Sequence, residues 1–252
     1  MDTGGGINFM IYNFQVNPLQ ITSMLKNCGP FWEPGMFAVM LNLALFLNIF
    51  VLKNTGRNNI ILIVAIITTF STAGYIILSF IFIAHSFYSK SKWSFIITLA
   101  ISVGFIYFTW NLDFMWNKFY NDFESASTND LTRFGAFYKH IKILKENLFL
   151  GGNLSGVTID NETGILANGI SNIFIAWGII GGTLYYIFMF LSCKKQLSNN
   201  QMDDSLYIVY FILLILLAFS QTVTTSLLYY VILMLGLTKQ SNKNLINEPN
   251  QI

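Results

Sequence analysis

Basic side chains are concentrated between residues 133 and 145, where they could bind an anionic group. A guanidinium pairs with phosphate oxygens through two parallel hydrogen bonds, and neighbouring ammonium groups add positive charge. Arg133 and the basic residues that support it could therefore present cations to an anionic headgroup. An ordinary polar helix face, exposed to water or to lipid headgroups, is the alternative for each of them. The supporting residues are Lys139, His140 and Lys142, and Lys145 lies on the same face.

Three further positions carry groups that could act on a substrate. Glu33 stands just before Pro34 and a long apolar run; its carboxylate could accept a proton from a hydroxyl group, or it could simply be favoured by a helix dipole. Gly151 and Gly152 predict a tight turn whose backbone amides could contact a ligand. Asn168 precedes another apolar run and is a candidate for a sugar contact or for a helix N-cap.

The sequence argues against two other kinds of binding. Cys28 and Cys193 are isolated, without metal-ligand spacing, so we expect neither a metal site nor a disulfide framework. The net charge of +2 is close to neutral, which argues against a nucleic-acid partner.

Composition indicates that lipid contacts much of the chain. Hydrophobic residues make up 54% and charged residues only 10%, whereas soluble domains carry about 25% charged residues. A membrane-spanning helix needs about 20 mostly apolar residues. Three apolar runs approach or reach that length: Phe37 to Leu52, Trp93 to Trp110 and Gly169 to Leu191.

Two longer apolar stretches each contain a polar break, and we predict that each forms a pair of helices. They run from Asn59 to Tyr88 and from Leu206 to Leu237. Pairing places all the short basic clusters on one side of the membrane, as is typical of cytoplasmic loops. These clusters are Lys53 with Arg57, Lys90 with Lys92, Lys194 with Lys195, and Lys239 with Lys243. A single span from Asn59 would instead move Lys53 and Arg57 to the opposite side.

The predicted fold is an all-α integral membrane protein with about seven transmembrane helices and one large extracytoplasmic loop. Within that loop, Phe134, Phe137, Ile141 and Leu144 recur at helical spacing and predict an amphipathic helix. No cleavable signal peptide precedes the first span, so we expect Met1 to be an internal start with further helices before it. The predicted segments are an extracytoplasmic segment (1–34), about four spans (35–110), the loop (111–166), about three spans (167–238) and a cytoplasmic tail (239–252).

Several motifs in this order resemble the O-antigen polymerase and O-antigen ligase superfamily. The run from Arg133 through HIKILKENLFLGGN to NGISNIFIAWGIIGG resembles its conserved core. The segments GPFWEPGMFAVMLNLALFL and TTFSTAGY resemble the polymerase branch and an outer helix–helix junction. Ligases carry His where this chain has Ala167, and they often carry Arg where it has Thr72. Both differences favour the polymerase.

The resemblance implies a metal-independent glycosyltransferase at the outer face of the bacterial inner membrane, without a cofactor. It would polymerise oligosaccharide repeat units carried on undecaprenyl pyrophosphate into O-antigen of lipopolysaccharide, or into a capsule-type polysaccharide. Membrane lipid and a chain-length regulator protein are the further partners that the resemblance implies. It assigns catalysis to Arg133 and Glu33, and substrate binding to Lys139, His140, Lys142, Gly151, Gly152 and Asn168.

Three alternatives remain open at this point. One is a ligase that transfers finished glycan to lipid A core or to protein. Another is a polytopic transporter or flippase, which should place ionisable groups within its spans; here the spans hold almost none. The last is a non-catalytic fragment.

Overall fold

The computed structural model describes residues 6–9, 12–16, 25–54, 56–88, 92–111, 120, 133–146, 148–152, 168–198 and 205–237. Helices predominate in this part of the chain, as predicted. They are α1 (Pro34–Phe46), the π-helix η1 (Leu47–Val51), α2 (Arg57–Thr68), α3 (Thr72–Tyr88), α4 (Lys92–Trp110), α6 (Arg133–Glu146), α8 (Gly169–Ser198), α9 (Leu206–Ser220), the 3-10 helix η3 (Val223–Thr225) and α10 (Leu227–Leu237).

A small antiparallel sheet before α1 corrects the prediction of an all-α chain. Its strands β1 (Gly6–Phe9), β2 (Tyr12–Val16) and β3 (Leu25–Gly29) pair in chain order. Apolar residues alternate along β1 and β2, which is the pattern of a strand. The sheet is joined to the helices by Asn27 Nδ2, which donates a hydrogen bond of 3.0 Å to Thr68 Oγ1 at the end of α2.

Both long apolar stretches form helical pairs, which confirms that prediction. α2 and α3 are separated by a turn in which Phe70 adopts a φ of 48°. Ser71 Oγ accepts a hydrogen bond of 3.2 Å from the Gly74 N–H and so caps α3. α9 and α10 are separated by Gln221 and η3. Polar side chains therefore end the helices where the sequence shows its polar breaks.

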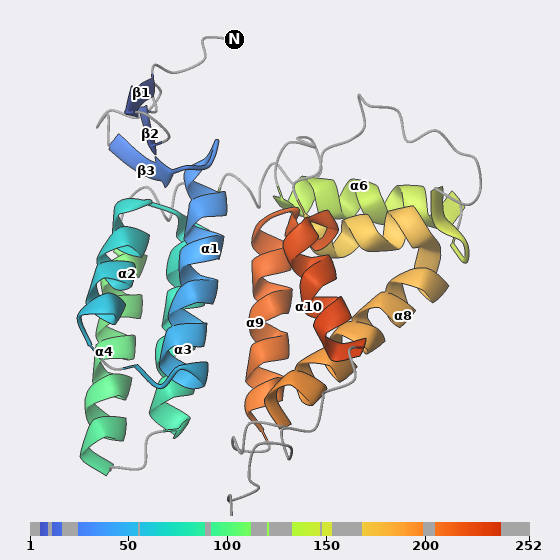
Figure 1. Ribbon diagram of the computed structural model, residues 1–252. Helices are drawn as coiled ribbons and strands as arrows, with labels where there is room; N and C mark the ends of the chain where they lie inside the picture. Colours follow the sequence, from blue (N-terminus) through green and yellow to red (C-terminus); the bar gives the residue numbers. More distant parts are fainter. Residues whose placement is uncertain are drawn as a thin grey trace, which may run out of the picture.

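The helices alternate in direction, so particular helix ends gather at each end of the bundle (Figure 1). The end beside β1–β3, called here the sheet end, holds the starts of α1, α3, α8 and α10 and the ends of α2 and α9. At the opposite end, the hydroxyl groups of Tyr88 and Ser205 lie 2.7 Å apart. The predicted basic clusters fall there for the residues that the structure describes: Lys53, Arg57, Lys92, Lys194 and Lys195.

The core lies between α1, α3, α8, α9 and α10. Phe46 of α1 stacks on Tyr210 of α9, with ring centroids 5.4 Å apart. α1 and α3 approach closely at Gly74, where an added Cβ would lie 2.8 Å from the Cβ of Ala38. Asn42 Nδ2 donates to the Gly74 carbonyl at 3.2 Å across the same contact. Small residues permit such close packing between membrane helices.

Two helices are long and apolar enough to cross a membrane: Pro34–Val51, which joins α1 to η1, and Gly169–Leu197. The helices α2, α3 and α9 are apolar but shorter. Large apolar side chains such as Ile60, Phe188 and Leu191 are exposed on the outside of the bundle, as lipid contact requires. These features favour a membrane protein, whereas the predicted count of about seven spans is not confirmed by helix length.

Candidate functional site

The start of α8 is capped by Asn168, one of the predicted site residues. Asn168 Oδ1 accepts hydrogen bonds from the N–H groups of Ile170 at 3.0 Å and Ser171 at 3.3 Å. This geometry is that of an N-cap. Asn168 is fully buried, and its Nδ2 has no hydrogen-bond partner among the residues that the structure describes. A buried donor of this kind could form a hydrogen bond to a ligand hydroxyl group.

α6 packs on the first part of α8 through a buried polar pair. His140 Nδ1 and Ser171 Oγ lie 2.7 Å apart, and only 4% of His140 is exposed. The prediction treated His140 as one of several cations on a polar face. The structure places it instead in the interface between the two helices, because the residues facing α8 are set by the helix rotation and not by polarity.

The remaining cations of α6 fall into different environments. Lys142 is exposed and Lys139 is half-buried. Arg133 is the first residue of α6, as predicted, and its side chain lies outside the part of the chain that the structure describes. The apolar residues Phe137 and Ile141 are 41% and 40% exposed. α6 lies across the sheet end (Figure 1), which suits a helix at a membrane surface.

Leu148, Phe149 and Leu150 form a turn, Gly151 and Gly152 follow it as the start of a helical segment, and this part of the chain packs into a bend of α8. At the bend, Gly178 adopts φ 66° and ψ −174°. Gly151 has a φ of 71°, and a Cβ added to it would lie 2.7 Å from the Ile175 carbonyl oxygen. The turn thus lies just before the two glycines, whereas the prediction placed it at them. It contacts α8 about 15 Å along the helix from Asn168. Its role in ligand binding stays a prediction.

Gln221, at the end of α9, lies between the starts of α1 and α8. A Cβ added to Gly35 would contact Gln221 Nε2 and would lie 4.0 Å from Glu33 Oε1. A Cβ added to Gly169 would lie 2.6 Å from the backbone carbonyl oxygen of Gln221. The absence of side chains at both glycines permits this close approach. The end of α9 therefore lies against both the start of α1, which Glu33 precedes, and the capped start of α8.

Glu33, Gln221 and Asn168 stand at the adjoining ends of α1, α9 and α8, and together they are called here the polar cluster at the sheet end. η3 holds one side of it, because Thr224 Oγ1 donates a hydrogen bond of 2.9 Å to the Gly169 carbonyl oxygen. Glu33 is half-buried and precedes α1 without a side-chain cap. The cluster thus combines a carboxylate that could act as a base with two amides that could bind hydroxyl groups.

Lys26, on β3 of the small sheet, is a half-buried cation. Burial lowers the pKa of Lys26 in β3 below its ordinary value, and the neighbouring Cys28 partly offsets this effect. Among the described residues, no three His, Cys, Asp or Glu side chains gather so that they could hold a metal ion.

Sequence reasoning missed Gln221, Ser171 and Thr224. The polar run from Ser220 to Thr225 was interpreted only as a break between helices. An amide side chain within such an apolar hairpin was the available signal for Gln221. No signal in the sequence could pair His140 with Ser171, because that contact depends on how α6 packs on α8.

The fold and the cluster together define a mostly helical protein with two helices that could cross a membrane and a polar cluster at one end. Comparisons with protein-family models, with curated proteins and with solved structures find no match to this chain.

Proposed function

We propose that this chain polymerises undecaprenyl-pyrophosphate-linked repeat units into a surface polysaccharide, as a multi-pass protein of the bacterial inner membrane. In this proposal the sheet end faces outward. The observation that carries it is the position of the cluster Glu33–Gln221–Asn168 at the same end as the basic helix α6. The motifs that resemble the O-antigen polymerase superfamily lie on these same elements.

The donor in the proposed reaction leaves as an anionic lipid pyrophosphate. Fixed cations stabilise the charge that develops on the leaving group. Arg133 at the start of α6 would pair with the phosphate oxygens, and exposed Lys142 would add positive charge. The apolar residues of α6 would lie among the lipids, which brings the helix to the depth of the headgroup.

The acceptor in the proposed reaction is a sugar hydroxyl group of another repeat unit. Its oxygen attacks the anomeric carbon of the donor, the bond from that carbon to the pyrophosphate oxygen breaks, and the hydroxyl proton passes to a base. Glu33 is the carboxylate available in the cluster for that proton. The Gln221 and Asn168 amides would hold the sugar by hydrogen bonds, since both lie beside the start of α8.

A transporter is less favoured by the positions of the ionisable groups. Transport paths commonly place ionisable side chains inside the spans. In α1, α9 and α10 there is no Asp, Glu, Lys, Arg or His at all. The charged residues lie instead in α6, at the ends of the apolar helices and in the segments between helices.

The test is complementation of a bacterial strain that lacks its own polymerase and makes the matching repeat unit. The gene encoding this chain is expressed as wild type, Arg133→Ala, Glu33→Gln or Lys92→Ala, and membrane levels are compared by immunoblot. Lys92 is the matched control, because it is an exposed cation at the end opposite the cluster. Surface glycan is then examined on a gel as a ladder of chain lengths.

We expect wild type and Lys92→Ala to restore the full ladder, and the two other variants to leave a single capped repeat. A normal ladder from Arg133→Ala or Glu33→Gln at equal membrane levels would remove that residue from the mechanism. An unchanged surface from wild type, together with altered export of another solute, would replace the polymerase with the transporter.

A further inference from the structure

A groove of about 500 Å³ opens between α1 with η1 and α2, at the end of the bundle opposite the cluster. Its walls are mostly apolar and consist of Ala44, Leu47, Leu52, Ile61 and Leu62. Ala44, Leu52 and Ile61 are exposed, so the groove is open to its surroundings on the outside of the bundle. Its volume falls within the range of about 300–1,000 Å³ that is typical of ligand sites.

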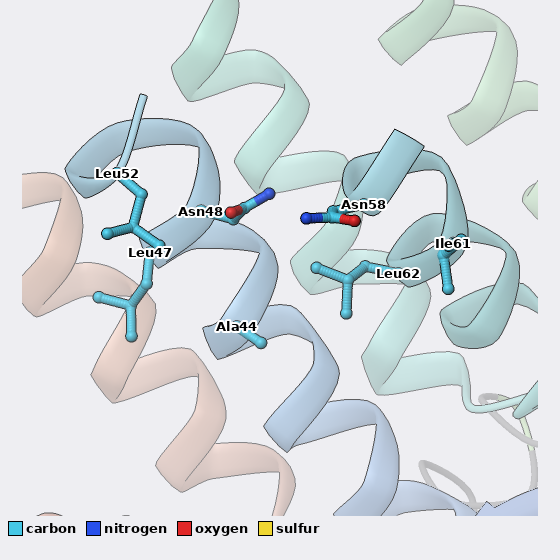
Figure 2. A pocket seen from close by; sticks show the side chains of 7 residues that line it. All are labelled: Ala44, Leu47, Asn48, Leu52, Asn58, Ile61 and Leu62. Carbon is cyan, nitrogen blue, oxygen red and sulfur yellow. The ribbon is translucent and has the colours of Figure 1, made fainter. Parts of the chain in front are cut away.

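Two asparagine side chains provide the polar part of this groove. Figure 2 shows the amide groups of Asn48 and Asn58 pointing toward one another across it. Asn48 is 8% exposed, and its Nδ2 donates a hydrogen bond of 2.5 Å to Asn59 Oδ1. Asn58 is exposed, and its side chain makes no hydrogen bond to the residues that the structure describes. The Asn58 amide is therefore available to a ligand.

Two basic residues adjoin the groove lining along the chain, next to Leu52 and Asn58. Lys53 follows η1 and Arg57 begins α2, and both side chains are exposed. The first turn of α2 contains no acidic residue, and the positive end of the α2 dipole points the same way. The groove thus combines an apolar channel with an amide donor, and two basic residues adjoin it along the chain. An anionic amphiphile has a matching apolar tail and a matching charged, hydrogen-bonding headgroup.

We propose that this groove binds one anionic phospholipid of the leaflet at the end opposite the sheet. One acyl chain lies along Leu47 and Leu62, the headgroup phosphate contacts Lys53 and Arg57, and Asn58 donates to an ester or phosphate oxygen. Charge complementarity selects an anionic over a zwitterionic headgroup, because basic residues next to a membrane span attract anionic lipids. The inference rests on the membrane location of the chain and not on polymerase activity.

The test measures lipid binding to the purified full chain by native mass spectrometry in detergent. Phosphatidylglycerol and phosphatidylcholine with the same acyl chains are titrated separately, and glycerol phosphate tests for a site that binds free phosphate only. The variants are Lys53→Gln with Arg57→Gln, which removes the charges, and Leu62→Trp, which fills the apolar part. The controls are Lys92→Gln at the same end of the bundle and Leu184→Trp on an exposed position of α8.

We expect wild type to bind one phosphatidylglycerol in preference to phosphatidylcholine. Removing both charges should lower the phosphatidylglycerol affinity about thirtyfold, which corresponds to about 2 kcal/mol at about 1 kcal/mol for each basic residue. Leu62→Trp should lower the affinity for both lipids, and the controls should behave as wild type. Thermal unfolding of each variant establishes that it is folded.

Equal binding of the two lipids by wild type would overturn the proposal. The same conclusion follows if the charge variant keeps its preference for phosphatidylglycerol, or if glycerol phosphate competes as well as the lipid does. If Leu62→Trp fails to fold, Ile61→Trp tests the same apolar wall from an exposed position.

Discussion

Gly178→Ala tests the bend of α8 and the turn that packs into it. Gly178 has a φ of 66° and a ψ of −174°, a region of backbone space that is occupied almost only by glycine. A Cβ at this position would contact the carbonyl group of Phe149 and would lie 2.7 Å from the Gly151 nitrogen. These are backbone atoms, so no change of side-chain rotamer can relieve the contact.

The expected cost of Gly178→Ala has two parts. Backbone strain of this kind costs about 1–3 kcal/mol. The added methyl group also displaces the turn, and this weakens the 2.9 Å hydrogen bond from the Ile179 N–H to the Leu148 carbonyl oxygen, for about 0.5–1.5 kcal/mol more. We therefore expect a loss of about 1.5–4.5 kcal/mol in the free energy of unfolding. At about 2–4 °C for each kcal/mol, the midpoint of thermal unfolding should fall by about 3–18 °C.

The assay is thermal unfolding of the purified chain in one detergent, supported by unfolding with increasing amounts of denaturing detergent. Gly104→Ala is the matched control, because Gly104 lies in α4 and a Cβ there meets nothing within 4 Å. Alanine at an exposed helical position is favoured over glycine by about 0.8–1.0 kcal/mol. The control should therefore unfold at the same temperature as wild type or above it. Equal midpoints for Gly178→Ala and wild type would refute the bent geometry of α8.

Two other substitutions test the packing of the bundle with the same assay. Gly74→Val should destabilise the chain by about 1–3 kcal/mol, because its Cβ would lie 2.8 Å from the Ala38 Cβ between α1 and α3; an unchanged midpoint would mean that these helices are not in close contact. Tyr229→Phe should cost about 0.6 kcal/mol, the average for a hydrogen bond between membrane helices, because the fully buried Tyr229 hydroxyl donates at 2.7 Å to the Leu214 carbonyl oxygen. A more stable Tyr229→Phe variant would contradict this assignment.

Local sequence patterns predicted most helices because the relevant signals are local. Apolar runs of sufficient length indicate helices in lipid, and the breaks at Ser71 and Gln221 predict their ends. The pairing of α2 with α3 followed from the positions of Lys53 and Arg57. The sheet was missed although β1 and β2 alternate apolar residues, because the segment before α1 was assigned only to a side of the membrane and its alternation was not used.

The sequence by itself predicted a mostly helical chain with long apolar runs, a helix beginning at Arg133, and an N-cap as one of two roles for Asn168. Each of these depends on residues close together in the chain. Only the tertiary structure decided that Gln221 lies between the starts of α1 and α8, and that His140 is buried against Ser171. The physical reason is that such contacts depend on how helices rotate and approach one another, and this is set by packing between segments far apart in the chain.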